Sequence, residues 1–186
     1  MTRTVLIFGL IAGGILAAMM VLTMPLYLTG RLSSDHSEVL GYTTMVLAFL
    51  MTFFGIRSYR ENNGGSITFG RGFKIGLLIT LIASAMYVIT WEIIYYGFFP
   101  NFADTYAAHA IEKARASGAS AAAIEKTRQQ MAQFREWYKN PLINIGMTFI
   151  EVFPVGLVMT LISAAILRKV QTPVQFSNGR PAAASR

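Results

Sequence analysis

The chain has no cysteine and few charged residues, and these two shortages narrow the kinds of protein it can be. Without cysteine, disulfide bonds, thiolate metal sites and cysteine nucleophiles are all excluded. Only 13% of the 186 residues are charged, whereas soluble domains carry about 25%. Hydrophobic residues make up 54% of the chain, and several apolar runs exceed the roughly 18 residues that can cross a bilayer. The composition therefore indicates an integral membrane protein.

Basic residues outnumber acidic ones, giving a net charge of +7. In a membrane chain such an excess reflects topology and contact with anionic lipid headgroups more often than contact with nucleic acid. We therefore expect the lipid bilayer as the partner, and no nucleic acid.

Apolar segments predict four membrane-spanning helices in one membrane domain of residues 1–170. The first resembles a signal peptide, but its apolar run of about 24 residues exceeds the roughly 7–15 residues of a signal core, so we expect it to be retained. The residues after the last span, 171–186, are polar and contain proline, which predicts a disordered cytoplasmic tail. The expected spans cover about residues 5–28, 39–56, 73–99 and 142–167.

Basic residues beside the spans predict the orientation of the chain. With four crossings, the second connection and both termini lie on the same side of the membrane, and their clustered positive charges mark that side as cytoplasmic. We therefore expect both termini in the cytoplasm, with Arg3 near the amino end. The candidate contacts for anionic lipid headgroups are Arg57, Arg60, Arg71, Lys74, Arg168 and Lys169.

The third connection, about residues 101–140, predicts a helical hairpin outside the membrane. Its first helix is expected to stop at Ser117–Gly118, and Ser120 can cap a second helix that ends before Pro141. A narrow apolar stripe follows the second helix, and such a stripe is first a packing face. We expect the hairpin to rest on its own bundle, with the docking of a partner as the alternative. The stripe consists of Ile124, Met131, Phe134 and Tyr138.

Small residues recur at four-residue spacing in the first and fourth spans. Such spacing lets helix backbones approach closely inside a membrane. Packing within the bundle is the expected use, and a homo-oligomer or a membrane-protein partner is the alternative. The residues are Gly9, Gly13 and Ala17 in the first span, and Gly156, Thr160 and Ala164 in the fourth.

Familiar catalytic and ligand-binding motifs are missing from the sequence. The glycine-rich segment "GSITFGRGFKIG" lacks the Gly-Lys-Ser/Thr ending of a phosphate-binding loop. No Gly-x-Ser-x-Gly or His-Glu-x-x-His pattern is present, and His36 and His109 lie far apart in the chain. We therefore expect no catalytic residue, no metal site and no cofactor.

Glu92 and Glu151 are the only ionisable residues well inside apolar segments. With a rise of about 1.5 Å per residue, they lie about 11 Å and about 14 Å below the outer surface. A carboxylate at that depth must be protonated, hydrogen-bonded or paired with a cation. The two acids therefore predict a polar centre at similar depth on consecutive helices.

Polar residues accompany both acids, and a proline frees a backbone acceptor near the second. Asn144 and Thr148 share a helix face with Glu151, while Tyr95 and Tyr96 share a face with Glu92. Pro154 leaves the carbonyl of Ile150 without its usual helical donor. These residues form a candidate intramembrane polar or ion site, or equally a structural cluster of hydrogen bonds between helices.

Three segments of the chain are distinctive: "FFGIRSYR", "GGSITFGRGFKIG" and "FIEVFPVGL". With them, about residues 1–169 resemble the bacterial membrane-protein family called domain of unknown function 4199. The resemblance implies acids at the positions of Glu92 and Glu151 and a proline at that of Pro154. The implied protein is a four-helix membrane protein of the bacterial cytoplasmic (inner) membrane with no assigned activity.

Together these observations predict an all-α, four-helix membrane bundle with an extracytoplasmic helical hairpin between the third and fourth spans. Three functions fit it. The first is a non-enzymatic accessory or envelope component, and the second is a small proton or cation carrier or channel that uses Glu92 and Glu151. Having only four spans without an inverted repeat weakens the carrier unless the protein oligomerises. The third, an intramembrane enzyme, is weakened by the missing nucleophile and metal motifs.

Overall fold

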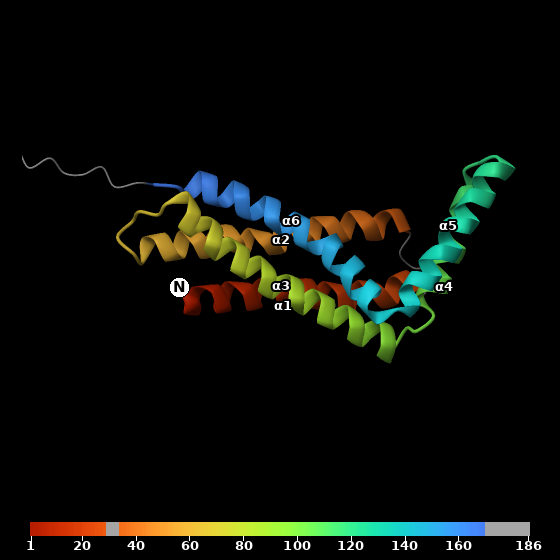
Figure 1. Ribbon diagram of the computed structural model, residues 1–186, viewed down its shortest axis with the longest axis horizontal. Coiled ribbons are helices and arrows are strands. Elements are labelled where there is room, and N and C mark those ends of the chain that lie inside the picture. The colour runs from red at the N-terminus through yellow and green to blue at the C-terminus, as the bar shows by residue number, and fades with distance from the viewer. Residues whose placement is uncertain (29–33, 170–186) are drawn as a thin grey trace, which may run out of the picture.

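Four long helices lie alongside one another as a bundle, and two shorter helices project from one end of it (Figure 1). The computed structural model describes residues 1–28 and 34–169. The predicted disordered tail, residues 171–186, lies outside these residues. The long helices are α1 (Thr2–Leu28), α2 (Ser34–Glu61), α3 (Phe69–Gly97) and α6 (Pro141–Leu167). The short ones are α4 (Phe102–Ala116) and α5 (Ala121–Lys139).

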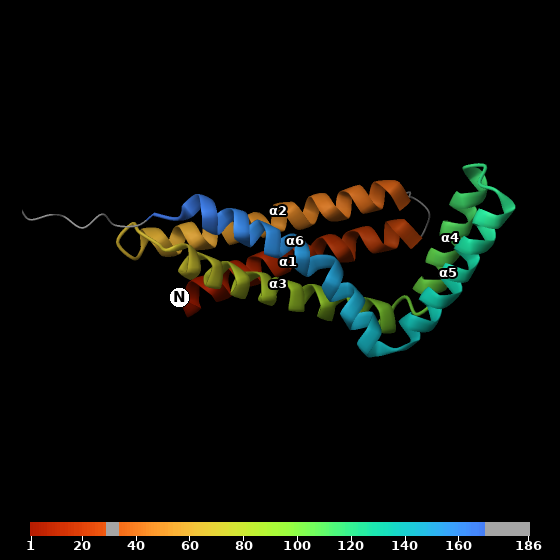
Figure 2. The ribbon, with the colours of Figure 1, turned by 45° about the horizontal axis from the view of Figure 1, so that its top comes forward.

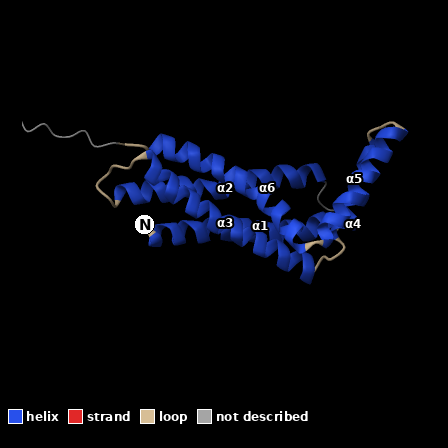
Figure 3. Cartoon of the chain, viewed as in Figure 1, coloured by secondary structure: helices blue, strands red, loops and turns tan. Residues whose placement is uncertain are grey.

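Helix accounts for nearly all of the described chain (Figure 3). Figure 2 shows α4 and α5 side by side, leaving the bundle at an angle beyond the ends of α3 and α6. The prediction of an all-α bundle with a helical hairpin between the third and fourth spans is confirmed.

The four long helices have the length and composition of a multi-pass membrane protein. Their apolar segments are 26, 23, 29 and 27 residues long, and about 20 residues are enough to cross the hydrocarbon core. Large apolar side chains such as Leu22, Ile89 and Ile150 remain exposed on the outward faces. Hydrocarbon in place of water would make that exposure favourable.

The long helices are arranged as a ring in which α1 and α6 each pack against both α2 and α3. Small residues let the helices approach closely. A Cβ atom added at Gly9 would lie 2.9 Å from Cβ of Ile82, and one added at Gly156 would lie 2.7 Å from the ring of Phe49. The small-residue positions therefore serve packing between helices of the same chain.

Hydroxyl groups bond α3 to α6 at the centre of the ring. Thr80 donates to the carbonyl of Gly156 at 3.3 Å, and its hydroxyl oxygen lies 3.0 Å from that of Thr160. Both threonines are fully buried. In a membrane such bonds stabilise helix pairs by about 0.6 kcal/mol each on average.

Basic residues collect at the end of the bundle opposite the hairpin, where α1 begins (Figure 1). There the segment between α2 and α3 is joined to the end of α6: Ile67 and Lys169 exchange two backbone hydrogen bonds of 2.8 and 3.0 Å. Arg60 donates to the carbonyl of Leu167 at 3.3 Å. All six residues expected to contact lipid headgroups lie in or beside this segment or at the end of α6.

The hairpin is shaped by one glycine and one serine. Gly118 ends α4 with a φ of 72°, which favours glycine. Ser120 then caps α5, because its hydroxyl accepts the amide N–H of Ala123 at 3.3 Å. The apolar stripe of α5 turns towards α4, with the rings of Phe134 and Tyr106 5.2 Å apart. The stripe thus packs within the hairpin and also against the bundle, since the ring of its Tyr138 lies 5.7 Å from that of Tyr95 on α3.

Candidate functional site

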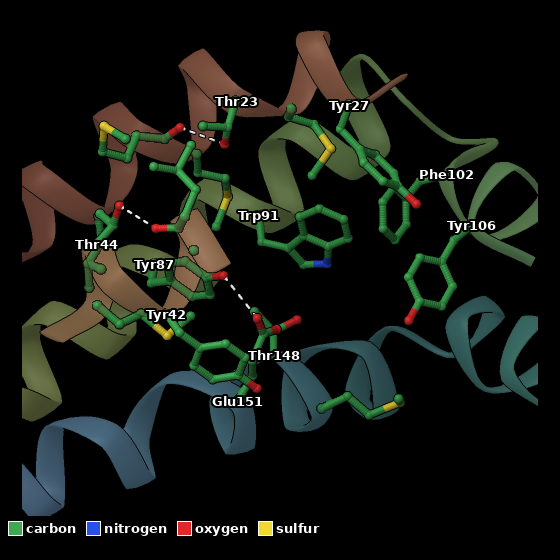
Figure 4. Close-up of a pocket in the computed structure, with 18 of the residues that line it drawn as sticks. Thr23, Tyr27, Tyr42, Thr44, Tyr87, Trp91, Phe102, Tyr106, Thr148 and Glu151 are labelled. Atoms are coloured by element: carbon green, nitrogen blue, oxygen red, sulfur yellow. Dashed lines mark hydrogen bonds between the residues drawn. The ribbon is translucent and has the colours of Figure 1, made fainter. Parts of the chain in front are cut away.

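A cavity of about 610 Å³ lies where the hairpin meets the bundle, and all six helices contribute to its walls (Figure 4). Small-molecule sites in proteins typically have volumes of about 300–1,000 Å³. Its lining is rich in methionine, with Met19, Met20, Met24, Met45 and Met147. Its aromatic side chains are Tyr27, Tyr42, Tyr87, Trp91, Phe102, Tyr106, Phe134 and Tyr138.

Glu151 of α6 is the one charged residue among those that line the cavity in the described part of the chain. Its side chain is exposed to the open space, and the hydroxyl of Tyr87 on α3 donates to its Oε1 at 3.5 Å. Figure 4 shows these two groups turned towards each other. Thr148, one turn before Glu151, also lines the cavity and donates to the backbone carbonyl of Asn144 at 3.0 Å.

Trp91 fixes the position of the cavity wall between α3 and α6. Its indole N–H donates to Oδ1 of Asn144 at 2.8 Å, and both side chains are buried. Its ring meets that of Phe102 edge-on at a centroid distance of 4.8 Å. One residue therefore joins the bundle to the first helix of the hairpin, and Figure 4 shows its ring among the other aromatic side chains.

The hairpin closes one side of the cavity with aromatic side chains. Phe134 and Tyr138 of α5 lie with their rings 4.3 Å apart. Burial raises the pKa of the Tyr138 phenol above its usual value, so the hydroxyl stays neutral at physiological pH. At the same end of the bundle, His109 of α4 and the hydroxyl of Tyr27 of α1 are 3.4 Å apart.

Glu92, which was predicted to share a polar centre with Glu151, does not line the cavity. It is half-buried, and its Oε1 is buried without a hydrogen-bond partner in the described residues. The structure gives no hydrogen bond between the two acids. Nδ2 of Asn144 is likewise buried and unpartnered. A joint ion site of Glu92 and Glu151 stays a prediction, and the cavity contains only the second acid.

The remaining residues of the predicted site are spread over different surroundings. Tyr95 is buried and donates to the backbone carbonyl of Tyr138 at 3.5 Å. Tyr96 is half exposed, and its ring meets that of Tyr95 at 4.9 Å. Pro154 lies in the middle of α6 with an exposed side chain and does not line the cavity. Only Thr148 and Glu151 of the predicted set face the cavity itself.

The sequence reasoning missed the walls that α1, α2 and Tyr87 supply. A signal was present in α3, where Tyr87 and Trp91 are four residues apart and so share a helix face. For Tyr42 and Thr44 of α2 the sequence carried no such signal, since they follow a short connection and look like ordinary span residues. Among the described residues, no three His, Asp or Glu side chains cluster closely enough to hold a metal ion.

Comparison with known proteins places the chain in a family without giving it an activity. No curated protein matches the chain, and no solved structure matches it. A family model described as "Protein of unknown function (DUF4199)" matches residues 7–169, which include all six helices except the first few residues of α1. The chain therefore belongs to this family of unknown function, the one that its sequence resembles.

Proposed function

We propose that the protein is a non-enzymatic accessory component of the bacterial inner membrane that binds a small amphipathic molecule in the cavity beneath the hairpin. The cavity carries this proposal. Its volume of about 610 Å³ and its apolar lining with a few polar groups are those of small-molecule sites. Its described lining offers one carboxylate and no second acid or basic residue, which argues against acid–base catalysis there.

In the proposed orientation both termini are cytoplasmic and the hairpin is extracytoplasmic. The gathering of basic residues at the end opposite the hairpin supports this, because positive charge beside membrane spans is retained in the cytoplasm. The same residues would contact anionic lipid headgroups. Arg57 is in part neutralised by Glu61 at 2.8 Å, so Arg71, Lys74 and Arg168 would supply most of that contact. The cavity would then open in the outer half of the membrane.

A proton or cation carrier that uses both Glu92 and Glu151 is the second candidate. The buried Oε1 of Glu92, which has no hydrogen-bond partner among the described residues, favours the carrier. An acidic residue inside a membrane is by default a candidate for a functional site. The carrier would need a connection between the two acids that the described side chains do not make. The cavity-bound ligand therefore has the stronger support.

Trp91 offers a direct test of ligand binding. The chain has two tryptophans, so Trp137→Phe leaves Trp91, in the cavity wall, as the only fluorescent indole. The protein in lipid nanodiscs would be titrated with the neutral fluorophore N-phenyl-1-naphthylamine, and energy transfer from Trp91 recorded. We expect transfer that saturates with probe concentration, as a defined site requires. Transfer that only follows partition of the probe into lipid would contradict the proposal.

Two glycines provide matched variants for this test. A Cβ atom added at Gly41, which lines the cavity, or at Gly14, which does not, would meet no atom within 4 Å. Gly41→Phe should therefore place a ring in the cavity and abolish saturable transfer, while Gly14→Phe should leave it unchanged. Equal behaviour of the two variants would show that the probe binds elsewhere.

A further inference from the structure

Among the residues that the structure describes, Glu151 has no basic partner. Its polar contact with the described protein is the Tyr87 hydroxyl at 3.5 Å, and the described residues that line the cavity include no lysine, arginine or histidine. A carboxyl group inside a membrane is protonated, hydrogen-bonded or paired with a positive charge. Since the described side chains around Glu151 supply no positive charge, a ligand that brings the charge itself would complete the site.

The walls around Glu151 suit an organic cation. Aromatic faces attract positive charge, and rings gathered around a quaternary ammonium group are a common way of binding it. Tyr42, Tyr87 and Trp91 line the cavity together with Glu151, and Figure 4 shows these side chains around the same open space. A carboxylate surrounded by several rings offers one cationic head group both a full negative charge and the partially negative faces of the rings.

A metal ion fits this cavity poorly. Hard divalent cations need six or more oxygen ligands at short distance, whereas here one carboxylate faces a space of about 610 Å³. The five methionines of the lining are flexible, polarizable side chains that adapt to apolar groups of varied shape. Volume and lining both point to a bulky molecule with apolar substituents.

We infer that the ligand of the cavity is a hydrophobic organic cation, whose charged head lies beside Glu151 among the rings of Tyr42, Tyr87 and Trp91. This inference rests on the proposed ligand-binding function and specifies its chemistry. An amphipathic neutral molecule and a lipid acyl chain are the competing occupants.

Two probes of the same shape separate the charge from the apolar contacts. Benzyltrimethylammonium and neopentylbenzene differ by the exchange of one nitrogen for carbon, and hence by one positive charge. Binding of each to the Trp137→Phe protein in nanodiscs would be followed by Trp91 fluorescence. We expect the cation to bind at least about 10-fold more tightly than its neutral counterpart, the ratio that an interaction with a partly buried charge provides. This comparison leaves every residue that lines the cavity unchanged.

Glu151→Gln then assigns the preference to one residue. It should weaken binding of the cation about 10-fold or more and leave binding of neopentylbenzene unchanged. Glu112→Gln removes the same charge from an exposed position of α4 and should change neither. An equal loss in both variants, or a cation that binds Glu151→Gln as well as the unchanged site, would overturn the inference.

The outcomes also distinguish this inference from the proposal on which it rests. Saturable binding of the neutral probes without preference for the cation would refute the cationic ligand and keep a ligand-binding cavity. If N-phenyl-1-naphthylamine, neopentylbenzene and benzyltrimethylammonium all fail to give saturable signals, both are refuted.

Discussion

Replacing Gly156 by alanine tests whether the close contact between α6 and α2 holds the bundle together. The added Cβ would lie 2.7 Å from the ring of Phe49, which is closer than such atoms approach in real structures. Phe49 and the neighbouring Thr80 are fully buried, so neither can move aside without displacing other core atoms. Overpacking of this kind costs about 1–3 kcal/mol. We expect the free energy of unfolding, measured by titration with a denaturing detergent in mixed micelles, to fall by that amount.

Gly146 of the same helix supplies the control, because a Cβ atom there would meet nothing within 4 Å. Both substitutions change the helix propensity of α6 equally, so the difference between them isolates the packing term. Gly146→Ala should leave stability unchanged or raise it by up to about 1 kcal/mol, the helix-propensity gain of alanine over glycine. If Gly156→Ala were as stable as Gly146→Ala, the helix approach described for this bundle would be wrong.

Three further changes test other parts of the structure. Trp91→Phe removes the bond to Asn144 and should cost about 0.6–1.7 kcal/mol in the same unfolding assay, whereas the exposed Trp137→Phe should cost almost nothing; equal losses would deny the bond a role. A reporter active only in the cytoplasm should work at the carboxyl end and fail near Gly118. Changing Arg57, Arg60, Arg71 and Lys74 together to Gln should give a mixture of the two orientations. A single, unchanged orientation after that change would show that other features set the topology. Ser120→Ala removes the cap of α5 and should destabilise its first turn by about 1 kcal/mol, seen as faster hydrogen exchange at Ala123; unchanged exchange would show that the cap is dispensable.

The sequence predicted the helices well because their signals are local. Long apolar runs mark the four spans, and Gly118 and Ser120 set the turn of the hairpin through their own backbone and side-chain chemistry. Even the end of α5 follows from Pro141, which stands at the first position of α6. None of these features depends on how one helix is rotated against another.

The cavity was not predictable in the same way, because it depends on helix rotation. Equal depth in the membrane was the argument for joining Glu92 to Glu151, and depth says nothing about the direction of a side chain. A step of one residue turns the direction by about 100°, which is why Trp91 lines the cavity and Glu92 does not. The walls from α1, α2 and the hairpin come from segments far apart in the chain, so no spacing rule connects them to Glu151.

The position of α6 in the ring has a consequence for biosynthesis. While a ribosome is still making the hairpin, α1, α2 and α3 are already in the membrane, and the place between α2 and α3 is empty. The hydroxyl of Thr80, which in the finished protein is bonded to Gly156 and Thr160 of α6, then has neither of these partners, and hydrocarbon supplies none. The three-helix intermediate therefore exposes a polar group that the complete bundle buries. Arrival of α6 gives the Thr80 hydroxyl its partners and supplies the cavity wall that carries Glu151 in the same step.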